Sequence, residues 1–217
     1  MSYEARAFPV KVSTKKTYDF GVKAGGVSCE LTTLGWRAGN PLVWWDPGSF
    51  NQERSSGAMH GALDIMAPLG ARVVAARSGR VLGRGEWLYN GERRDGAGWS
   101  EDGGWYVRVV TPDGGSDYYA HLRERPRVRP GQRVYAEQTL GEVGQTGNAA
   151  STCPHLHYGV RAPGGAVVNP TPQLTALFDR GGWVERSIPP VALAFGLVAT
   201  GGMGIMLYYG GRFVQGR

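Results

Sequence analysis

Cysteine, histidine and charge are all scarce in this chain of 217 residues. Two cysteines, Cys29 and Cys153, are too few for a disulfide scaffold, although they could form one bridge. Charged residues make up 19%, below the usual share of about a quarter, but an apolar share of 41% excludes a disordered chain. The first residues, MSYEARAFPVKVSTKK, contain no apolar core, so they do not predict a secretory signal peptide.

Glycine is abundant instead, with 35 residues, and 7 tryptophans and 13 prolines accompany it. Long helices tolerate glycine poorly, which disfavours a helical bundle, and the lack of a G-X-Y period excludes collagen. The sequence therefore predicts a mainly β fold of short strands joined by tight turns. The strand-like runs, separated by Gly and Pro-Asp-Gly turns, are residues 71–76, 80–82, 106–110, 117–120 and 157–160.

Two segments lack this pattern of short strands and turns. Residues 1–40 alternate only weakly and are expected to form an arm or added strands. Residues 84–105 form a long gap between strand-like runs and are expected to be an insertion loop. The tryptophans in this loop leave two interpretations open. The loop could form one wall of a substrate groove, or it could pack on its own aromatic side chains.

The C-terminal part is apolar, with no charged residue between Arg186 and Arg212. Its core, VALAFGLVATGGMGIMLYY at 191–209, would span about 28 Å as a helix, close to the thickness of a bilayer core. We expect a transmembrane helix there, and a buried soluble helix is the alternative. Small residues recur every four positions and would let such helices associate: Gly196, Thr200 and Gly204. The expected flanking parts are a linker, 181–190, and a short tail, 210–217.

The net charge is +6 and the pI is about 9.5. This balance suits nucleic acid, an anionic membrane or an anionic wall polymer as a partner, and it also suits a protein that simply needs to stay soluble.

All four histidines stand in patterns that favour a metal site. His60 and Asp64, in HGALD, share one face whether the backbone is helical or extended. His155 and His157, in HLH, share one face of a strand. Imidazole and carboxylate are ligands of zinc, and three protein ligands with one open position are typical of a catalytic site. A histidine outside the ligand set could then act as a general base or as an oxyanion stabiliser.

Five segments resemble, in order, the conserved blocks of the lysostaphin/LytM-type zinc metalloendopeptidases. They are HGALDIMAPLGARVVAARSGRV, SDYYAHL, VRPGQRVYAEQTLGEVGQTGN, TCPHLHYGV and VNPTPQL, which together span residues 57–174. The resemblance implies a LytM-like domain over 41–180, with an antiparallel β-sheet, a groove and short helices.

The resemblance also implies the chemistry. One zinc ion would be held by His60, Asp64 and His157, with His121 and His155 as catalytic histidines. The implied activity is cleavage of a peptide bond in the stem or crosslink of bacterial peptidoglycan, and both glycyl and diaminopimelate bonds stay open. No nucleic acid partner is expected. The expected groove residues are Trp87, Arg93, Arg94, Trp99, Trp105 and Tyr119.

Cys153 occupies the position of a family glycine, and a small buried residue or a bridge to Cys29 is expected there rather than a metal ligand. Two non-catalytic alternatives share the fold: a wall-binding or virion structural module, and an activator that docks onto an amidase. The predicted C-terminal span implies a lipid bilayer as a partner. It would anchor the protein in an internal virion membrane, as an entry lysin, or in a bacterial inner membrane with access to the cell wall.

Overall fold

The computed structural model divides the chain into two units, residues 1–185 and 186–217. The residues that it describes are 4–13, 22–23, 27–29, 43–54, 57–88, 91, 93–185, 208–209 and 212–213. The larger unit is almost entirely β, which confirms the mainly β prediction, and Thr171–Asp179 (α1) is the one α-helix within these ranges.

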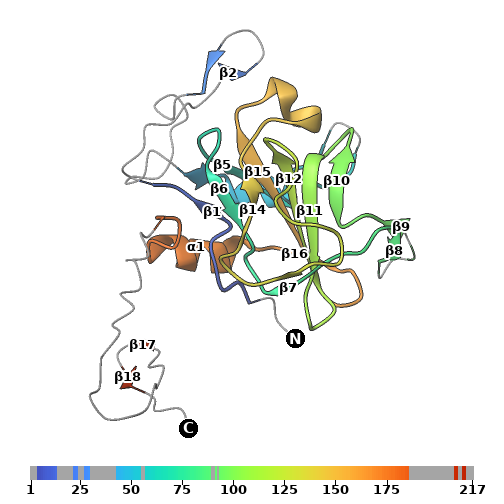
Figure 1. Cartoon of the computed structure of the whole chain (residues 1–217). Helices are drawn as coiled ribbons and strands as arrows, with labels where there is room; N and C mark the ends of the chain where they lie inside the picture. The colour runs from blue at the N-terminus through green and yellow to red at the C-terminus, as the bar shows by residue number, and fades with distance from the viewer. Residues whose placement is uncertain are drawn as a thin grey trace, which may run out of the picture. The chain divides into compact units, whose positions relative to one another are not determined.

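A nine-stranded antiparallel sheet forms the body of the larger unit (Figure 1). Its strands are β4 (Trp44–Trp45), β5 (Leu63–Met66), β7 (Gly79–Val81), β10 (Ala97–Ser100), β11 (Gly104–Val110), β12 (Ser116–Leu122), β13 (Arg133–Val134), β15 (His155–Arg161) and β16 (Val167–Val168). The main order is β13-β7-β11-β12-β15-β5-β4, with β10 also paired to β11 and β16 to β15. The five strand-like runs of the sequence all contain observed strands.

A second sheet of three strands has the order β1-β6-β14. Its strands are β1 (Val10–Lys11), β6 (Arg72–Val74) and β14 (Thr139–Glu142). Smaller elements are the β2–β3 pair (Val22–Lys23 and Val27–Ser28) and the 3-10 helices η2 (Pro47–Asn51) and η3 (Gly147–Ser151). Because β1 pairs with β6, part of the N-terminal 40 residues adds a strand to this sheet.

The hydrophobic core joins both sheets and α1. Alternation along the strands sends Val107 and Val109 of β11 inward, where they are fully buried. Val73 of β6 and Leu174 of α1 belong to the same buried cluster. The opposite face of the large sheet carries the intermediate positions of the burial pattern, and this face holds the polar residues considered below.

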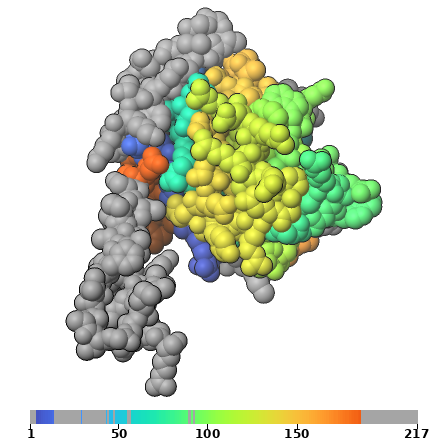
Figure 2. Space-filling model, in the orientation of Figure 1, coloured from blue at the N-terminus to red at the C-terminus, as the bar shows by residue number. Residues whose placement is uncertain are grey.

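The segment 84–105 is not the loop that its glycines predicted. Glu86–Trp87 (β8) pairs with Arg93–Arg94 (β9) as a hairpin, and β10 extends the large sheet beside β11. Trp99 of β10 lies opposite Trp105 of β11, so cross-strand packing of aromatic rings orders the segment in spite of its glycines. Figure 2 shows the hairpin residues, in green, at the right side of the molecule.

The second unit bears on the predicted membrane span. Tyr208–Tyr209 (β17) pairs antiparallel with Arg212–Phe213 (β18), so the last two residues of the expected helix are extended instead. Aromatic residues favour strands, which accounts for this difference. Residues 191–207, including the small-residue positions, lie outside the described part of the chain. Among the described residues, no helix is long and apolar enough to cross a membrane.

A buried ion pair lies on the core-facing side of the large sheet. Arg77 donates to both carboxylate oxygens of Asp117, with Nη2 2.8 Å from Oδ1 and Nε 3.1 Å from Oδ2. Asp117 is fully buried and Arg77 is nearly so. The Tyr119 hydroxyl lies 3.3 Å from the same carboxylate and accepts a hydrogen bond from the Ala76 amide.

Replacing Asp117 with alanine should lower the free energy of unfolding by about 3–5 kcal/mol, because it removes the carboxylate that compensates a buried guanidinium. Denaturant titration measures the change. The matched control is Asp113→Ala, whose half-exposed carboxylate lies 3.8 Å from the same guanidinium, and its cost should be clearly smaller. Equal costs would show that the burial of the pair does not matter.

Candidate metal centre and active site

Three of the residues expected to bind zinc converge on one point. His60 Nε2 lies 3.2 Å from Asp64 Oδ1 and 3.1 Å from His157 Nδ1. His157 Nδ1 lies 2.9 Å from the same Asp64 oxygen. These are the three side chains in the described residues whose ligand atoms could together hold a metal ion.

Strand pairing and one turn bring the three residues together. Asp64 of β5 lies directly opposite His157 of β15, so both side chains point to the same face of the sheet. His60 precedes β5 and is followed by Gly61, whose φ of 60° favours glycine. Its ring is fixed by a hydrogen bond from Nδ1 to the Ser49 carbonyl, 2.8 Å away.

The donor set fits zinc. In the neutral His60 ring, with the proton on Nδ1 toward Ser49, Nε2 carries the lone pair and faces a carboxylate oxygen and a second imidazole nitrogen. Three such atoms repel one another unless a cation or a proton lies between them. Their separations of 2.9–3.2 Å approach the edge of about 3.3 Å expected for ligands around tetrahedral zinc.

The ionised form of the Asp64 carboxyl is strongly favoured. Burial alone would raise its pKa, but the adjoining His157 and His60 imidazoles outweigh burial and hold the pKa of this carboxyl far below its usual range. Burial lowers the pKa of His157 in turn, so this imidazole favours the neutral form that a metal ligand requires.

The two expected catalytic histidines lie beside this group. The ring centroids of His121 and His155 are 4.9 Å apart, and those of His121 and His157 are 5.6 Å apart. His121 Nδ1 donates to the Thr146 carbonyl at 2.9 Å, and His155 Nδ1 donates to the Cys153 carbonyl at 2.8 Å. In the neutral form of either ring, Nε2 is therefore the nitrogen that carries the lone pair, and Nε2 of His155 lies 3.9 Å from Asp64 Oδ1.

A β-bulge sets the direction of the His121 side chain. The pairing of β12 with β11 shifts by one residue between Trp105 and Val107, and His121 itself has a φ of 61°. Bulges of this kind re-aim a side chain and are common beside active sites. Burial, followed by the neighbouring His155 and His157, lowers the pKa of His121 to about 3, so His121 is neutral at pH 7.

Two of the expected groove residues lie at this site. Trp99 and Trp105 contact each other edge to face with ring centroids 5.4 Å apart. The Trp105 amide donates to Thr146 Oγ1, and Thr146 is the residue whose carbonyl holds His121. Trp105 packs against the hydrophobic core and lies opposite the buried Leu122, whereas Trp99 is 53% exposed.

Tyr119 is not a groove residue, because it is completely buried. Side chains alternate along a strand, so Tyr119 points into the core and its neighbour Tyr118 points to the face that carries the histidines. Tyr118 lies edge to face with His157, at a centroid distance of 6.0 Å. The prediction that Tyr119 lines the groove is therefore wrong.

Trp87, Arg93 and Arg94 lie on the β8–β9 hairpin. The Arg93 guanidinium lies over the Trp87 ring, 5.6 Å from its centroid. Glu86 of the hairpin pairs with Arg80 of β7, which attaches the hairpin to the side of the sheet away from β5 (Figure 1). The structure thus groups these residues with β7 rather than with the histidines.

Cys153 forms a disulfide with Cys29, which was one of the two alternatives expected from the sequence. Its sulfur is therefore not a thiolate ligand. The bridge joins the N-terminal region to the turn whose carbonyl holds His155.

The sequence interpretation did not identify the groups that hold the rings. They are the backbone carbonyls of Ser49, Thr146 and Cys153. A pattern of side chains does not show which backbone carbonyls will accept hydrogen bonds. Thr146 nevertheless lies in the GQTG segment, which resembles one of the family's blocks.

Known proteins match this chain in the same region. Residues 58–170, or 113 of 217, match Peptidase family M23. The L-Ala--D-Glu endopeptidase of Bacillus subtilis (strain 168) is 29% identical over 143 residues, which cover 62% of this chain and 39% of that protein. Lysostaphin of Staphylococcus simulans is 33% identical over 105 residues, which cover 48% of this chain and 18% of lysostaphin. The chain thus spans well under half the length of both relatives.

The fold has a solved counterpart. The crystal structure of a putative glycyl-glycine endopeptidase lytM from Ruminococcus gnavus ATCC 29149 superposes with a TM-score of 0.57 at 24% identity, covering 81% of this chain and 61% of that one. At this identity the likeness concerns the fold alone. The family match covers more than half of the chain and contains all five site residues, which confirms the resemblance seen in the sequence: the chain belongs to peptidase family M23.

Proposed function

We propose that this protein is a zinc-dependent endopeptidase that cleaves a peptide bond in the stem or crosslink of bacterial peptidoglycan. The observation that carries the proposal is the convergence of His60, Asp64 and His157 on one point, beside two histidines whose Nδ1 atoms are held by backbone carbonyls. One relative is named as an endopeptidase, which supports the same reaction type here.

His60, Asp64 and His157 would hold the ion. When bound, zinc supplies a Lewis acid that polarises a carbonyl and lowers the pKa of water to about 7. Asp64 contributes a negative charge whose ionisation is already favoured, and the Ser49 carbonyl keeps the His60 ring in the orientation that presents Nε2.

His121 and His155 would move the protons. Each has Nδ1 occupied by a backbone carbonyl, so each can accept a proton at Nε2 from the attacking water and return it to the leaving amine. As imidazolium, each can also donate a hydrogen bond to the oxygen of the tetrahedral intermediate. The proton taken from water ends on the new amino group, so the protons balance over one hydrolysis.

The Trp99–Trp105 pair would contact the substrate beside His121. Replacing Trp99 with alanine should raise KM for a crosslinked peptidoglycan fragment roughly 10-fold with little change in kcat, because an exposed aromatic contact contributes about 1–2 kcal/mol to binding. Steady-state kinetics on the soluble fragment provide the measurement.

Trp87→Ala is the matched control, because Trp87 is also exposed but lies on the β8–β9 hairpin. Its KM should match that of the wild type. A KM that rises equally in both variants, or in neither, would refute the assignment of the Trp99–Trp105 pair to the substrate groove.

The proposal as a whole is tested by zinc content and wall digestion together. Purified protein should hold one equivalent of zinc, and a chelator should remove both the zinc and the lysis of purified sacculi. Added zinc should restore lysis to the wild type but not to His60→Ala. A protein with no zinc and no lysis, indistinguishable from His60→Ala, would instead support a wall-binding module or an amidase activator.

A further inference from the structure

A cavity of about 370 Å³ lies at the β7–β13 end of the large sheet. It is lined by Ser78, Gly79, Arg80, Val110, Thr111, Pro112, Arg133, Val134 and Tyr135, and none of the five metal-centre and catalytic residues is among them. Its volume is within the range of about 300–1,000 Å³ typical of sites for small ligands. The cavity therefore has room for a ligand group of its own.

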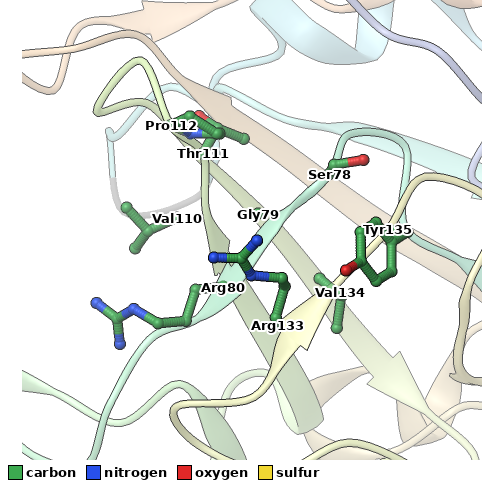
Figure 3. A pocket seen from close by; sticks show the side chains of 9 residues that line it. All are labelled: Ser78, Gly79, Arg80, Val110, Thr111, Pro112, Arg133, Val134 and Tyr135. Atoms are coloured by element: carbon green, nitrogen blue, oxygen red, sulfur yellow. The ribbon is translucent and has the colours of Figure 1, made fainter.

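Two guanidinium groups face this cavity from neighbouring strands. Arg80 of β7 lies directly opposite Arg133 of β13, and Figure 3 shows both side chains extending in the same direction, toward the side where Val110 lies. Like charges directly opposite each other across a strand pair repel. Arg80 is balanced by Glu86, whereas Arg133 pairs with no carboxylate in the described part of the chain. One positive charge at the cavity is thus left for a ligand.

An aromatic ring adds to the cavity. Tyr135, two residues after Arg133, is 61% exposed although it is a large side chain. A guanidinium fork beside an exposed ring suits an oxyanion carried on an organic chain, since the fork binds the anion and the ring contacts the chain.

The cavity shares a face with the metal centre. His157 and Arg161 are four residues apart on β15, so their side chains point to the same side of the sheet. The row of paired residues that begins at Arg161 crosses the sheet through Ser116, Val110, Arg80 and Arg133. At 3.4 Å per residue this row lies roughly 14 Å along the strands from His157, and at about 4.8 Å per strand Arg80 and Arg133 lie roughly 14–19 Å across them. The separation is therefore about 20–24 Å, or six to seven residues of an extended peptide.

We propose that the Arg80–Arg133 cavity is a second binding site, which takes a carboxylate of the acidic stem peptide while the scissile bond lies at the histidines. This inference rests on the proposed function for its ligand, and the separation suits a peptide of six or seven residues that lies across both sites. The site contributes affinity and selects acidic stems over amidated ones.

Binding experiments test this site separately from cleavage. A soluble stem-peptide fragment with free carboxylates and its amidated counterpart are titrated calorimetrically against the full chain in chelator, where neither is cut. Wild type should bind the acidic fragment roughly 10-fold more tightly. Arg133→Gln should remove this difference, and Arg125→Gln, which loses the same charge at an exposed position outside the cavity, should keep it. Unfolding midpoints show that each variant is folded.

Three outcomes would overturn the proposal: equal affinity of wild type for both fragments, equal losses in the two variants, or no binding of either fragment. Binding to whole walls that disappears when phosphodiester polymers are extracted would assign the cavity to phosphate and also refute the carboxylate ligand. Lysis of sacculi under zinc reports on the proposed function separately, so failure of one idea does not hide failure of the other.

Discussion

Replacing Asp64 with alanine is expected to abolish zinc binding and peptidase activity together. The Asp64 carboxylate lies within 3.2 Å of both imidazole ligand atoms and supplies the only negative charge among the three ligands. Removing it leaves two neutral imidazoles, so zinc affinity should fall by more than about 100-fold, beyond what loss of an outer-shell partner causes. Zinc content by mass spectrometry and digestion of sacculi measure the two effects.

Asp102→Ala is the matched control for this variant. Asp102 is an exposed carboxylate in the turn before β11, one residue from the Gly103 carbonyl that accepts the His121 amide. It should keep one equivalent of zinc and full activity. Retention of stoichiometric zinc by Asp64→Ala would contradict the assignment of Asp64 as a ligand.

Replacing His121 with alanine is expected to separate zinc binding from peptidase activity. His121 lies beside the ligands without belonging to their group, so the variant should keep its zinc. Its kcat should fall about 10²–10⁴-fold, the usual loss when a positioned acid–base group is removed. Kinetics on a soluble crosslinked fragment, with zinc content measured on the same sample, provide the test.

His155→Ala should behave similarly, because its ring is anchored in the same way. Loss of zinc from His121→Ala would mean that the residue supports the metal rather than the proton transfer. A kcat within a few-fold of wild type would remove it from the mechanism altogether.

Much of this site is visible in the sequence because strand geometry has a simple period. The HLH pair must share a face of its strand, and the HGALD spacing brings His60 back to Asp64 in any regular conformation. The same period decides between Tyr118 and Tyr119 only when the register of the strand relative to the core is known. That register depends on partners far along the chain, so the sequence alone did not reveal that Tyr119 faces the core.

Other features depend on tertiary contacts that no local pattern encodes. The bulge that turns His121 toward His155 arises from the pairing of β12 with β11. The glycine-rich segment 84–105 predicted a loop, yet the pairing of Trp99 with Trp105 makes part of it a strand. The Arg80–Arg133 pair is invisible in sequence because the two residues are 53 positions apart and meet only through the β7–β13 register.

The most direct test of the central claim is a count of new amino groups released from purified peptidoglycan. Hydrolysis of a peptide bond creates one free amino group at each cut, which can be labelled, and the masses of the products identify the bond. The account predicts that amino groups accumulate with the zinc-loaded wild type and stay at background with His121→Ala at equal zinc content. Background levels with the zinc-loaded wild type, or equal release by both proteins, would contradict it.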